Sequence, residues 1–478
     1  MHYGEITVSE EKLRATHVGY YKIGENKGNK RIWIQGCNLT AANFTRGNNY
    51  KVVYNYDTKI IILTLSDGVT GRKVSGRKKP DGSYSPIVEL SNASLVDVTG
   101  GAKRIRADFY ENEIHITIHH HEAARFMREE SLKKNLHNGI ITKGVLCAGI
   151  GVSAAASHDA FIDSGIKSST EFVVDRERKY LDTLVQNNHI VTNDTQIFEA
   201  TLEEIEPSLL KPINLLEVSL PCTGHSIAGR SKLGLKYAEE HSTDATAIFG
   251  LIKIVESCNP AVIVSENVTQ ARDSTTYILL KGLLELLGYN ISETELDNEN
   301  TKALQNRKRY WLVATSTGLT NVDLTSFPKF ETRYNKLSDM LDDNIPDAMW
   351  RSTAEKIRKA AVNKANGKGF GFNLVTGDVT TISTIGKGYQ KSRATEPHLA
   401  GDNDTMRLLT PIEICRSQCI PTHLIANTVA QTGYEGIGQS IDYRQGYGIT
   451  QLIVKSIMDH QVGTPIQPKH ISNELDIF

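Results

Sequence analysis

The sequence predicts an α/β protein that has a doubly wound, Rossmann-like sheet, a small insert domain and a β-rich N-terminal domain. Three observations support this fold class. From residue 143 onward, short apolar runs typical of buried strands alternate with helical segments. Residues 1–125 instead hold short β-branched and aromatic runs separated by Gly, Asn and Asp. Residues 318–400 interrupt the alternation, because they are rich in Gly, Asn, Thr, Lys and Arg and poor in long apolar runs.

Length and composition restrict the classes of protein that fit. A chain of 478 residues is too long for one ordinary core, so two or three domains are expected. No apolar run approaches a membrane span, and Met1–Glu5 lacks the pattern of a signal peptide. The six scattered cysteines form no CxxC pair, which favours a reducing cytoplasm. The net charge is -1, so any DNA-binding surface must come from local charge asymmetry.

The N-terminal segment is predicted to contain several short strands followed by a linking helix. The expected strands are residues 31–34, 50–54, 59–65 and 114–118. The Gly- and Pro-containing segment 71–82 is a hairpin tip or loop, whose five basic residues either contact phosphates or are simply solvated. His119, His120 and His121 follow a strand, where successive side chains point to opposite faces. An exposed strand end is therefore expected there, and no metal site. Residues 122–137 are predicted to form the helix.

The α/β region is predicted from six apolar runs and the helices between them. The expected strands are residues 145–148, 171–175, 190–194, 215–218, 261–265 and 310–314. Helices are expected at 154–162 and 179–187, and Thr410–Glu413 has the Pro and Glu of a helix start. The predicted domains are 1–137, a core of 138–317, an insert of 318–405, and a C-terminal segment of 406–478 that completes the core.

A glycine-containing turn follows the first of these strands. Gly149 and Gly151 permit a tight turn that a ligand can press against. Asp175 ends the second predicted strand, where a carboxylate can accept from ribose hydroxyls, and Asp194 ends the third, where it can accept from an adenine amino group. The alternative is that both aspartates are ordinary strand-terminal caps. No third glycine follows Gly151, which argues against a pyrophosphate cofactor.

Three further motifs follow in order along the chain. Pro221-Cys222 ends an apolar run, and proline fixes the backbone so that one thiol is presented on a defined turn. The segment 265–268 reads Ser-Glu-Asn-Val, and 305–309 reads Gln-Asn-Arg-Lys-Arg. Each motif alone is weak, since most single cysteines are packing residues and arginines at a strand start are often surface charges.

This ordered set resembles the DNA cytosine-5 methyltransferase family over roughly residues 144–462. The resemblance implies that the chain uses S-adenosyl-L-methionine and acts on double-stranded DNA. It gives Cys222 the role of nucleophile towards cytosine C6, and Glu266 that of proton donor to N3. It implies contact of Arg309 with the target base, of Arg307 with DNA or the nucleophile loop, and base flipping. The cofactor-binding positions are Gly149, Gly151, Asp175 and Asp194.

The chain departs from the family pattern at several positions. Cys147 stands where the family usually has Phe, and Thr223 and His225 stand where Gln and Phe are common. Tyr447 replaces an Asn that lines the cofactor end of the site. DNA specificity is expected in the insert, where four residues supply positive charge and an aromatic ring. These are Lys387, Tyr389, Lys391 and Arg393.

Two other functions remain open. One is the same chemistry on tRNA; the insert of about eighty residues favours a groove of duplex DNA instead. The other is a catalytically silent DNA-binding regulator on the same scaffold. The enzyme is expected in a bacterial or phage-infected cytoplasm, without membrane association, as a monomer on DNA and with a possible cognate restriction endonuclease.

Overall fold

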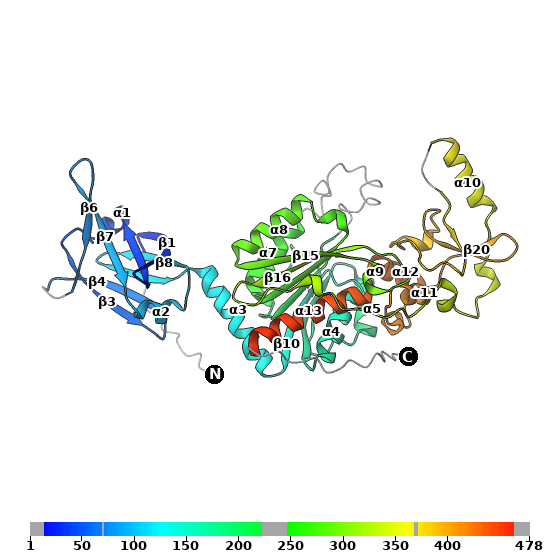
Figure 1. Cartoon of the computed structure of the whole chain (residues 1–478), viewed down its shortest axis with the longest axis horizontal. Coiled ribbons are helices and arrows are strands. Elements are labelled where there is room, and N and C mark those ends of the chain that lie inside the picture. The colour runs from blue at the N-terminus through cyan, green and yellow to red at the C-terminus, as the bar shows by residue number, and fades with distance from the viewer. Residues whose placement is uncertain (1–13, 69–70, 222–245, 368–370, 463–478) are drawn as a thin grey trace, which may run out of the picture. The chain divides into compact units, whose positions relative to one another are not determined.

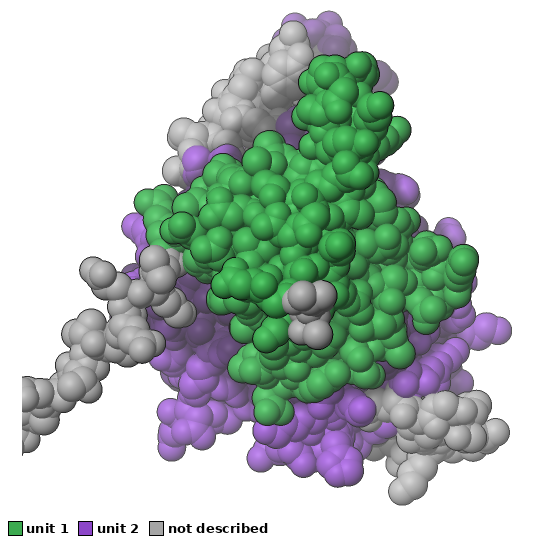
Figure 2. Space-filling model, turned by 90° about the vertical axis from the view of Figure 1, so that its left-hand side faces the viewer, with its two compact units in different colours: residues 1–126 green, residues 127–478 purple. Residues whose placement is uncertain are grey.

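The chain consists of two compact units, residues 1–126 and 127–478 (Figures 1 and 2). The computed structural model describes residues 14–68, 71–221, 246–367 and 371–462. The boundary between the units lies within helix α3 (His120–His137). No helix in these described ranges is long and apolar enough to cross a lipid bilayer.

Unit 1 is a nine-stranded sheet in the order β5-β3-β4-β9-β8-β1-β2-β7-β6, in which all neighbours pair antiparallel. Its strands are β1 (His17–Asn26), β2 (Asn29–Gln35), β3 (Asn49–Asn55), β4 (Ile60–Ser66), β5 (Arg72–Lys73), β6 (Ser75–Lys78), β7 (Tyr84–Ser91), β8 (Arg104–Tyr110) and β9 (Glu113–Ile118). Only Val74 separates the two edge strands β5 and β6, so the sheet must curl until its edges lie close together.

The curled sheet encloses a core of its own. Ile32, Leu63 and Phe109 are fully buried in it, and the short helices α1 (Cys37–Ala41) and α2 (Ser94–Thr99) add Leu39 and Leu95. The four strands predicted in this segment are confirmed as β2, β3, β4 and β9. Their signal was strong because alternate residues enter the core while the others face solvent.

Unit 2 contains a seven-stranded sheet in the order β12-β11-β10-β13-β14-β16-β15. Its strands are β10 (Ile140–Leu146), β11 (Lys167–Asp175), β12 (Gln196–Glu199), β13 (Leu215–Val218), β14 (Val262–Asn267), β15 (Tyr289–Leu296) and β16 (Arg309–Ser316). The strands from β10 to β14 run parallel, and β16 is antiparallel to both its neighbours. The predicted Rossmann-like α/β class agrees with this sheet.

Helices cover both faces of the sheet (Figure 1). One face packs against α4 (Val152–Asp163), α13 (Tyr443–Val462) and the second half of α3, and the other against α7 (Ala247–Cys258) and α8 (Thr275–Leu286). The other α-helices among the described residues are α5 (Arg178–Asn187), α9 (Asn298–Thr301), α10 (Ala354–Ala365), α11 (Pro411–Ser417) and α12 (Ala430–Gln439). The predicted helix start is confirmed, since the Thr410 and Glu413 side chains form a capping box on α11.

The order of strands reverses at β10. The chain runs from β10 outward to β11 and β12, then returns to β13 on the other side of β10. The carboxyl ends of β10 and β13 therefore flank the switch point, where ligands bind in open α/β sheets. The turn that holds Gly149 follows β10, and the segment that leads to Pro221 follows β13.

The insert adds a second, small sheet to unit 2. Its order is β17-β20-β19-β18, from β17 (Arg351–Ser352), β18 (Leu374–Val375), β19 (His398–Ala400) and β20 (Thr405–Arg407). The 3-10 helices of unit 2 are η1 (Pro207–Leu209), η3 (Thr269–Ala271), η4 (Leu324–Ser326), η5 (Leu337–Met340), η6 (Asp347–Met349), η7 (Tyr389–Lys391) and η8 (Thr422–Ile425). The very short strands explain why no strand was predicted here.

Candidate active site

The turn after β10 is tied to the end of β11 by one carboxylate. Gly149 has φ 55°, and its N–H donates to Asp175 Oδ2 over 2.7 Å. The other oxygen of Asp175 accepts from the N–H of Glu177 over 2.8 Å. Burial raises the pKa of Asp175, while these two backbone donors oppose the rise. The carboxylate therefore fixes the shape of the turn as well as facing the switch point.

The two glycines of the turn meet different surroundings. A Cβ on Gly151 would come within 2.4 Å of Asn188 Nδ2 and 2.9 Å of Leu184 Cδ1. Gly151 is thus required for packing against α5, and Asn188 also donates to its carbonyl over 2.9 Å. A Cβ on Gly149 would meet only Gln439 Nε2, at 3.6 Å. The space beside the Cα of Gly149 is therefore open to a ligand, whereas that beside Gly151 is filled by protein atoms.

Asp194 does not lie where the sequence suggested. No strand forms over 190–194; the third strand is β12, which begins two residues after Asp194. Because β12 is parallel to β11 and Gln196 pairs with Phe172, Asp194 precedes the amino end of β12, level with the middle of β11 and away from Asp175. The Thr195 hydroxyl accepts from Thr192 N–H and holds this segment as a turn.

The acidic residue that ends β12 is Glu199. It pairs in register with Asp175, so both lie at the same edge of the sheet. Glu199 is exposed and accepts from Arg178 Nη1 over 3.3 Å. Sequence reasoning missed it because the strand was placed six residues too early.

Residues 219–221, which lead from β13 to the predicted nucleophile Cys222, lie at the switch point. The N–H of Ser219 donates to the Leu146 carbonyl, and Asn267 Nδ2 donates to the Leu220 carbonyl over 3.1 Å. Pro221 is the last residue described before a gap. Cys222, Thr223 and His225 lie outside the described residues.

Glu266 lies one strand further along, near the end of β14. It is 8% exposed, and its Oε1 contacts Arg309 Nε at 2.9 Å. Burial raises the pKa of Glu266 although Arg309, Arg307 and a Ser219 hydrogen bond lower it. This carboxyl group therefore retains a proton at higher pH than an exposed glutamate does.

Arg307 does not face a DNA-binding surface. Its side chain is 1% exposed and donates to the carbonyls of Ile385 and Gly438, each over 3.0 Å. It therefore joins the start of β16 to the insert and to α12. A guanidinium in the interior cannot reach a phosphate or a base edge, so this burial speaks against the expected contact with DNA. The alternative, a contact with the nucleophile loop, stays a prediction because residues 222–245 lie outside the described residues.

An open cleft of about 360 Å³ lies beside the Glu266–Arg309 pair. It is lined by Val268, Thr269, Gln270, Asn306, Lys308, Arg309, Ser383 and Thr384. The lining comes from the turn after β14, from the start of β16 and from the insert. It is polar and carries two cationic side chains, which suits a nucleotide.

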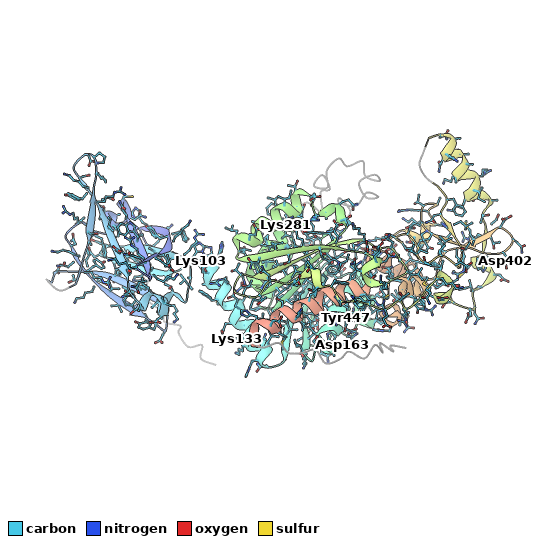
Figure 3. All side chains as sticks on the ribbon, viewed as in Figure 1. Lys103, Lys133, Asp163, Lys281, Asp402 and Tyr447 are labelled. Atoms are coloured by element: carbon cyan, nitrogen blue, oxygen red, sulfur yellow. The ribbon has the colours of Figure 1, made fainter. Side chains whose placement is uncertain are left out.

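Tyr447 and Tyr389 both make contacts within unit 2. Tyr447 on α13 donates to Asp163 Oδ2 over 2.7 Å, at the end of α4 opposite the glycine turn (Figure 3). Tyr447 therefore does not line the cofactor end of the site. Tyr389 is fully buried, and its hydroxyl donates to the Pro397 carbonyl, so it offers no ring to DNA.

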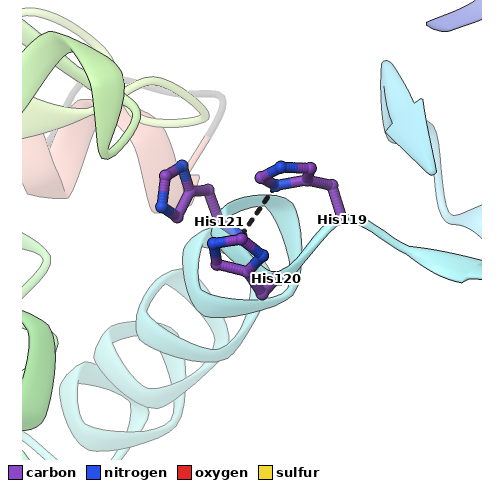
Figure 4. A group of neighbouring side chains, drawn as sticks. All are labelled: His119, His120 and His121. Carbon is purple, nitrogen blue, oxygen red and sulfur yellow. Dashed lines mark hydrogen bonds between the residues drawn. The ribbon is translucent and has the colours of Figure 1, made fainter. Parts of the chain in front are cut away.

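The three adjacent histidines are closer together than strand geometry predicts. His119 follows β9 and His120 begins α3, so the backbone changes direction between them (Figure 4). One ring nitrogen from each lies within 4.8 Å of the others. His119 is buried, not an exposed strand end, and burial lowers its pKa to about 4. Its Nδ1 already accepts from the N–H of His121.

Two buried residues that support the glycine turn, Lys143 and Gly436, were not predicted from the sequence. Lys143 on β10 is fully buried, and its Nζ contacts Glu217 Oε1 of β13 at 3.0 Å and the Ala154 carbonyl of α4 at 2.8 Å. At the end of α12, a Cβ on Gly436 would meet Ile150 at 2.7 Å. Both groups hold the glycine turn in place, yet each occurs as an ordinary residue within a regular element.

The comparisons with known proteins match the α/β region of the chain. The model of the C-5 cytosine-specific DNA methylase family matches residues 142–455. The type II methyltransferase M1.ScrFI of Lactococcus lactis subsp. cremoris is 27% identical over 242 residues, which are 48% of this chain and 59% of that protein. M.NlaX of Neisseria lactamica is 26% identical over 306 residues, 62% of this chain and 90% of that one. The chain thus spans about three fifths of the first relative.

Solved structures share the fold at low identity. A Dnmt2 methyltransferase of S. pombe has 16% identity and a TM-score of 0.53, and covers 66% of this chain and 98% of its own. The Entamoeba histolytica methyltransferase EhMeth has 17% identity and the same TM-score, and covers 67% and 98%. Residues 1–126 lie outside the matched family model.

Proposed function

This chain belongs to the C-5 cytosine-specific DNA methylase family, and from that premise we propose that it methylates C5 of cytosine in a specific sequence of duplex DNA. The enzyme class predicted from the sequence, DNA cytosine-5 methyltransferase, is the class to which this family belongs. The observation that carries the proposal is the buried Glu266–Arg309 pair, next to the strand end that leads to Cys222 and beside an open polar cleft.

The residues at the switch point fit S-adenosyl-L-methionine. Gly149 leaves room for a ligand, and a carboxylate such as Asp175 accepts about four hydrogen bonds, of which the backbone takes two. Asp175 and Glu199 would accept from the nucleoside hydroxyls and amino group, and no phosphate-binding third glycine is required. When bound, the cofactor supplies a methyl group carried on a positively charged sulfur.

Cys222 activates the base. Cytosine C5 is a poor nucleophile, and addition of the Cys222 thiolate to C6 makes it a good one. The new Sγ–C6 bond moves the C5–C6 π pair to C4–C5 and the C4–N3 pair to N3. N3 then takes the proton of Glu266, and burial favours this protonated form by raising the pKa of the carboxyl group. The C4–C5 pair then bonds to the methyl carbon as the methyl–sulfur bond breaks, and N3 returns its proton to Glu266. Loss of the C5 proton to water re-forms the C5–C6 double bond and expels Cys222 as the thiolate, which completes the turnover.

Arg309 positions the Glu266 carboxyl group, and Asn267 positions the residues before Cys222. The Arg309 guanidinium keeps the Glu266 carboxyl group in place and lines the cleft, where it would contact the base. Asn267 fixes the residues before Cys222 through Leu220. C6 is hidden in a stacked duplex, so the target base must leave the helix and enter the cleft. The insert, which supplies Ser383 and Thr384 to the cleft, would read the flanking sequence.

The test is methyl transfer by the purified full chain. Tritiated S-adenosyl-L-methionine with duplex DNA should label the DNA, and bisulfite sequencing should locate one recognition sequence. Cys222→Ser should abolish both the label and the covalent adduct with 5-fluorocytosine DNA, whereas Cys258→Ser, a buried thiol on α7, should retain them. Label incorporated by Cys222→Ser would refute the proposed nucleophile.

The same assay separates the two alternatives. Label in tRNA but not in DNA would assign the chemistry to tRNA, and DNA binding without label in either would identify a silent regulator. We infer that the protein acts on DNA as a monomer. We also infer that it has a cognate restriction endonuclease, because the relatives are type II methyltransferases. Sedimentation of the protein–DNA complex tests the former.

A further inference from the structure

The hairpin of β6 and β7 concentrates positive charge on an otherwise nearly neutral chain. Unit 1 has 18 Lys and Arg against 13 Asp and Glu, whereas the whole chain has 54 against 55. An open depression of about 610 Å³ lies at this hairpin. It is lined by Gln35, Arg77, Lys78, Lys79, Pro80 and Ser85. No carboxylate lines it, and the three basic side chains are exposed.

Internal hydrogen bonds give the hairpin a defined shape. The Lys79 N–H donates to the Ser83 carbonyl over 2.8 Å, and the Gly82 N–H returns to Lys79 over 3.0 Å. The carboxylate of Asp81 at the tip is occupied by the N–H and hydroxyl of Ser83, at 2.9 and 2.6 Å. The acidic residue of the tip is thus directed into the turn, while no ion pair engages Arg77, Lys78 or Lys79 within the described ranges.

Aromatic and amide groups border the basic depression. The Arg46 guanidinium stacks 3.7 Å over the ring of Tyr84, which is 40% exposed and begins β7 next to the turn. Gln35 donates to Ser85 Oγ over 3.4 Å and accepts from Trp33 Nε1 over 3.4 Å. Figure 1 shows the hairpin extending beyond the body of the sheet. A projecting two-stranded ribbon with unpaired cations, amides and flat rings fits a groove and backbone of B-DNA.

We propose that the β6–β7 hairpin is a second DNA-binding site, which holds the phosphate backbone of duplex DNA through Arg77, Lys78 and Lys79. This goes beyond the proposed function, since none of its residues belongs to the catalytic unit. It rests on that function only for the choice of duplex DNA as the ligand. A site on unit 1 would strengthen DNA binding without taking part in the chemistry.

The test is the salt dependence of DNA binding by the full chain. Fluorescence anisotropy with a 40-base-pair duplex, between 50 and 400 mM KCl, gives the slope of log K against log salt. Each phosphate contact contributes about 0.9 to that slope, so R77A/K78A/K79A should lower its magnitude by about 2.7. Affinity at 0.1 M salt should fall about 10²-fold. The kcat for methylation at saturating DNA should stay unchanged while KM for DNA rises.

A matched variant removes the same charge elsewhere on unit 1. Lys22 and Lys51 are exposed on β1 and β3, and Lys27 is exposed in the turn between β1 and β2. K22A/K27A/K51A should change the slope by less than about 1. Equal loss in both triple variants, or an unchanged slope in R77A/K78A/K79A, would overturn the proposal. Equal thermal melting of the variants verifies that unit 1 is folded.

The proposal and the catalytic assignment fail in different ways. In Cys222→Ser protein no adduct forms, so the hairpin effect on affinity measures binding alone. Loss of the salt-slope difference with methylation intact would reject the hairpin site only. Absence of methylation with the slope difference intact would reject the proposed function only.

Discussion

Glu266 shows how one side chain acquires chemical character from its surroundings. Removal from water raises its pKa, and a guanidinium 2.9 Å away keeps the carboxyl group oriented without cancelling that rise. An exposed glutamate at the end of β14 would be ionised at neutral pH and unable to give N3 a proton. The raised pKa is therefore the property on which the proposed mechanism relies.

Glu266→Gln tests this role. The amide can still donate a hydrogen bond to N3 but has no acidic proton, so kcat should fall about 10²- to 10⁴-fold. KM for DNA should change little, as measured by steady-state methylation. Glu256→Gln, at an exposed carboxylate on α7, is the control and should keep kcat within about twofold. An unchanged kcat in Glu266→Gln would contradict proton donation by this residue.

Asp442, at the start of α13, should make stability depend on pH. Burial raises its pKa from 3.8 to about 6, against hydrogen bonds from Thr301 and the Arg444 N–H. A raised folded pKa means that the folded state favours the protonated form. The associated stability is present below about pH 4 and is lost as the pH rises through 6.

Asp442→Asn should remove this dependence. The free energy of unfolding of the wild type should fall by about 2 kcal/mol more than that of the variant between pH 4 and 7. Urea denaturation at each pH measures it, and Asp343→Asn, at an exposed carboxylate, serves as the control. Parallel curves for wild type and Asp442→Asn would contradict the assignment.

At the scale of elements, a buried ion pair connects β10, β13 and α4 near the switch point. Lys143 of β10 contacts Glu217 of β13 and the backbone of α4, which begins at the glycine turn. The pair joins the strand that leads to the glycine turn to the strand that leads to Cys222. Desolvation makes such a pair costly to break from one side.

Lys143→Met should therefore destabilise unit 2 by about 3–5 kcal/mol, because Glu217 would remain buried without its partner. The double variant Lys143→Met/Glu217→Leu should recover most of that loss. Denaturant unfolding measures both. Lys211→Met removes the partially exposed pair with Glu171 and should cost less than about 1 kcal/mol. A double variant as unstable as the single one would contradict the ion-pair account.

At the scale of the whole molecule, the two units have separate hydrophobic cores. Every residue of the core in unit 1 lies between residues 32 and 116, and the clusters of unit 2 begin at residue 132. Because each unit has a core of its own, unfolding of the chain should not be a single cooperative transition.

Scanning calorimetry should resolve two transitions. Phe109→Ala opens a cavity in the core of unit 1 and should lower the Tm of one transition only, at a cost of about 3–5 kcal/mol. Phe161→Ala, buried on α4, should lower the other transition by a similar free energy. A single transition that shifts equally in both variants would show that the units unfold together.

The sequence by itself determined the elements whose residues alternate between core and solvent or form continuous buried runs. The strands β2, β3, β4, β9, β11 and β13 and the helices α4, α5 and α11 were predicted because local periodicity and capping specify them. The order of the motifs identified the family, and Glu266 was selected for its place at a buried strand end. Burial bore out the expected direction of its pKa.

Only the tertiary structure decided which of the selected residues share one edge of the sheet. Asp194 precedes the short strand β12, and Glu199 ends it. Only the parallel register with β11 shows that Glu199, and not Asp194, lies beside Asp175. Arg307 and Arg309 look equivalent in sequence, yet one is enclosed by Ile385 and Gly438 and the other lines a cleft. Partners from distant segments fix register, burial and charge pairing, and local sequence does not contain those long-range contacts.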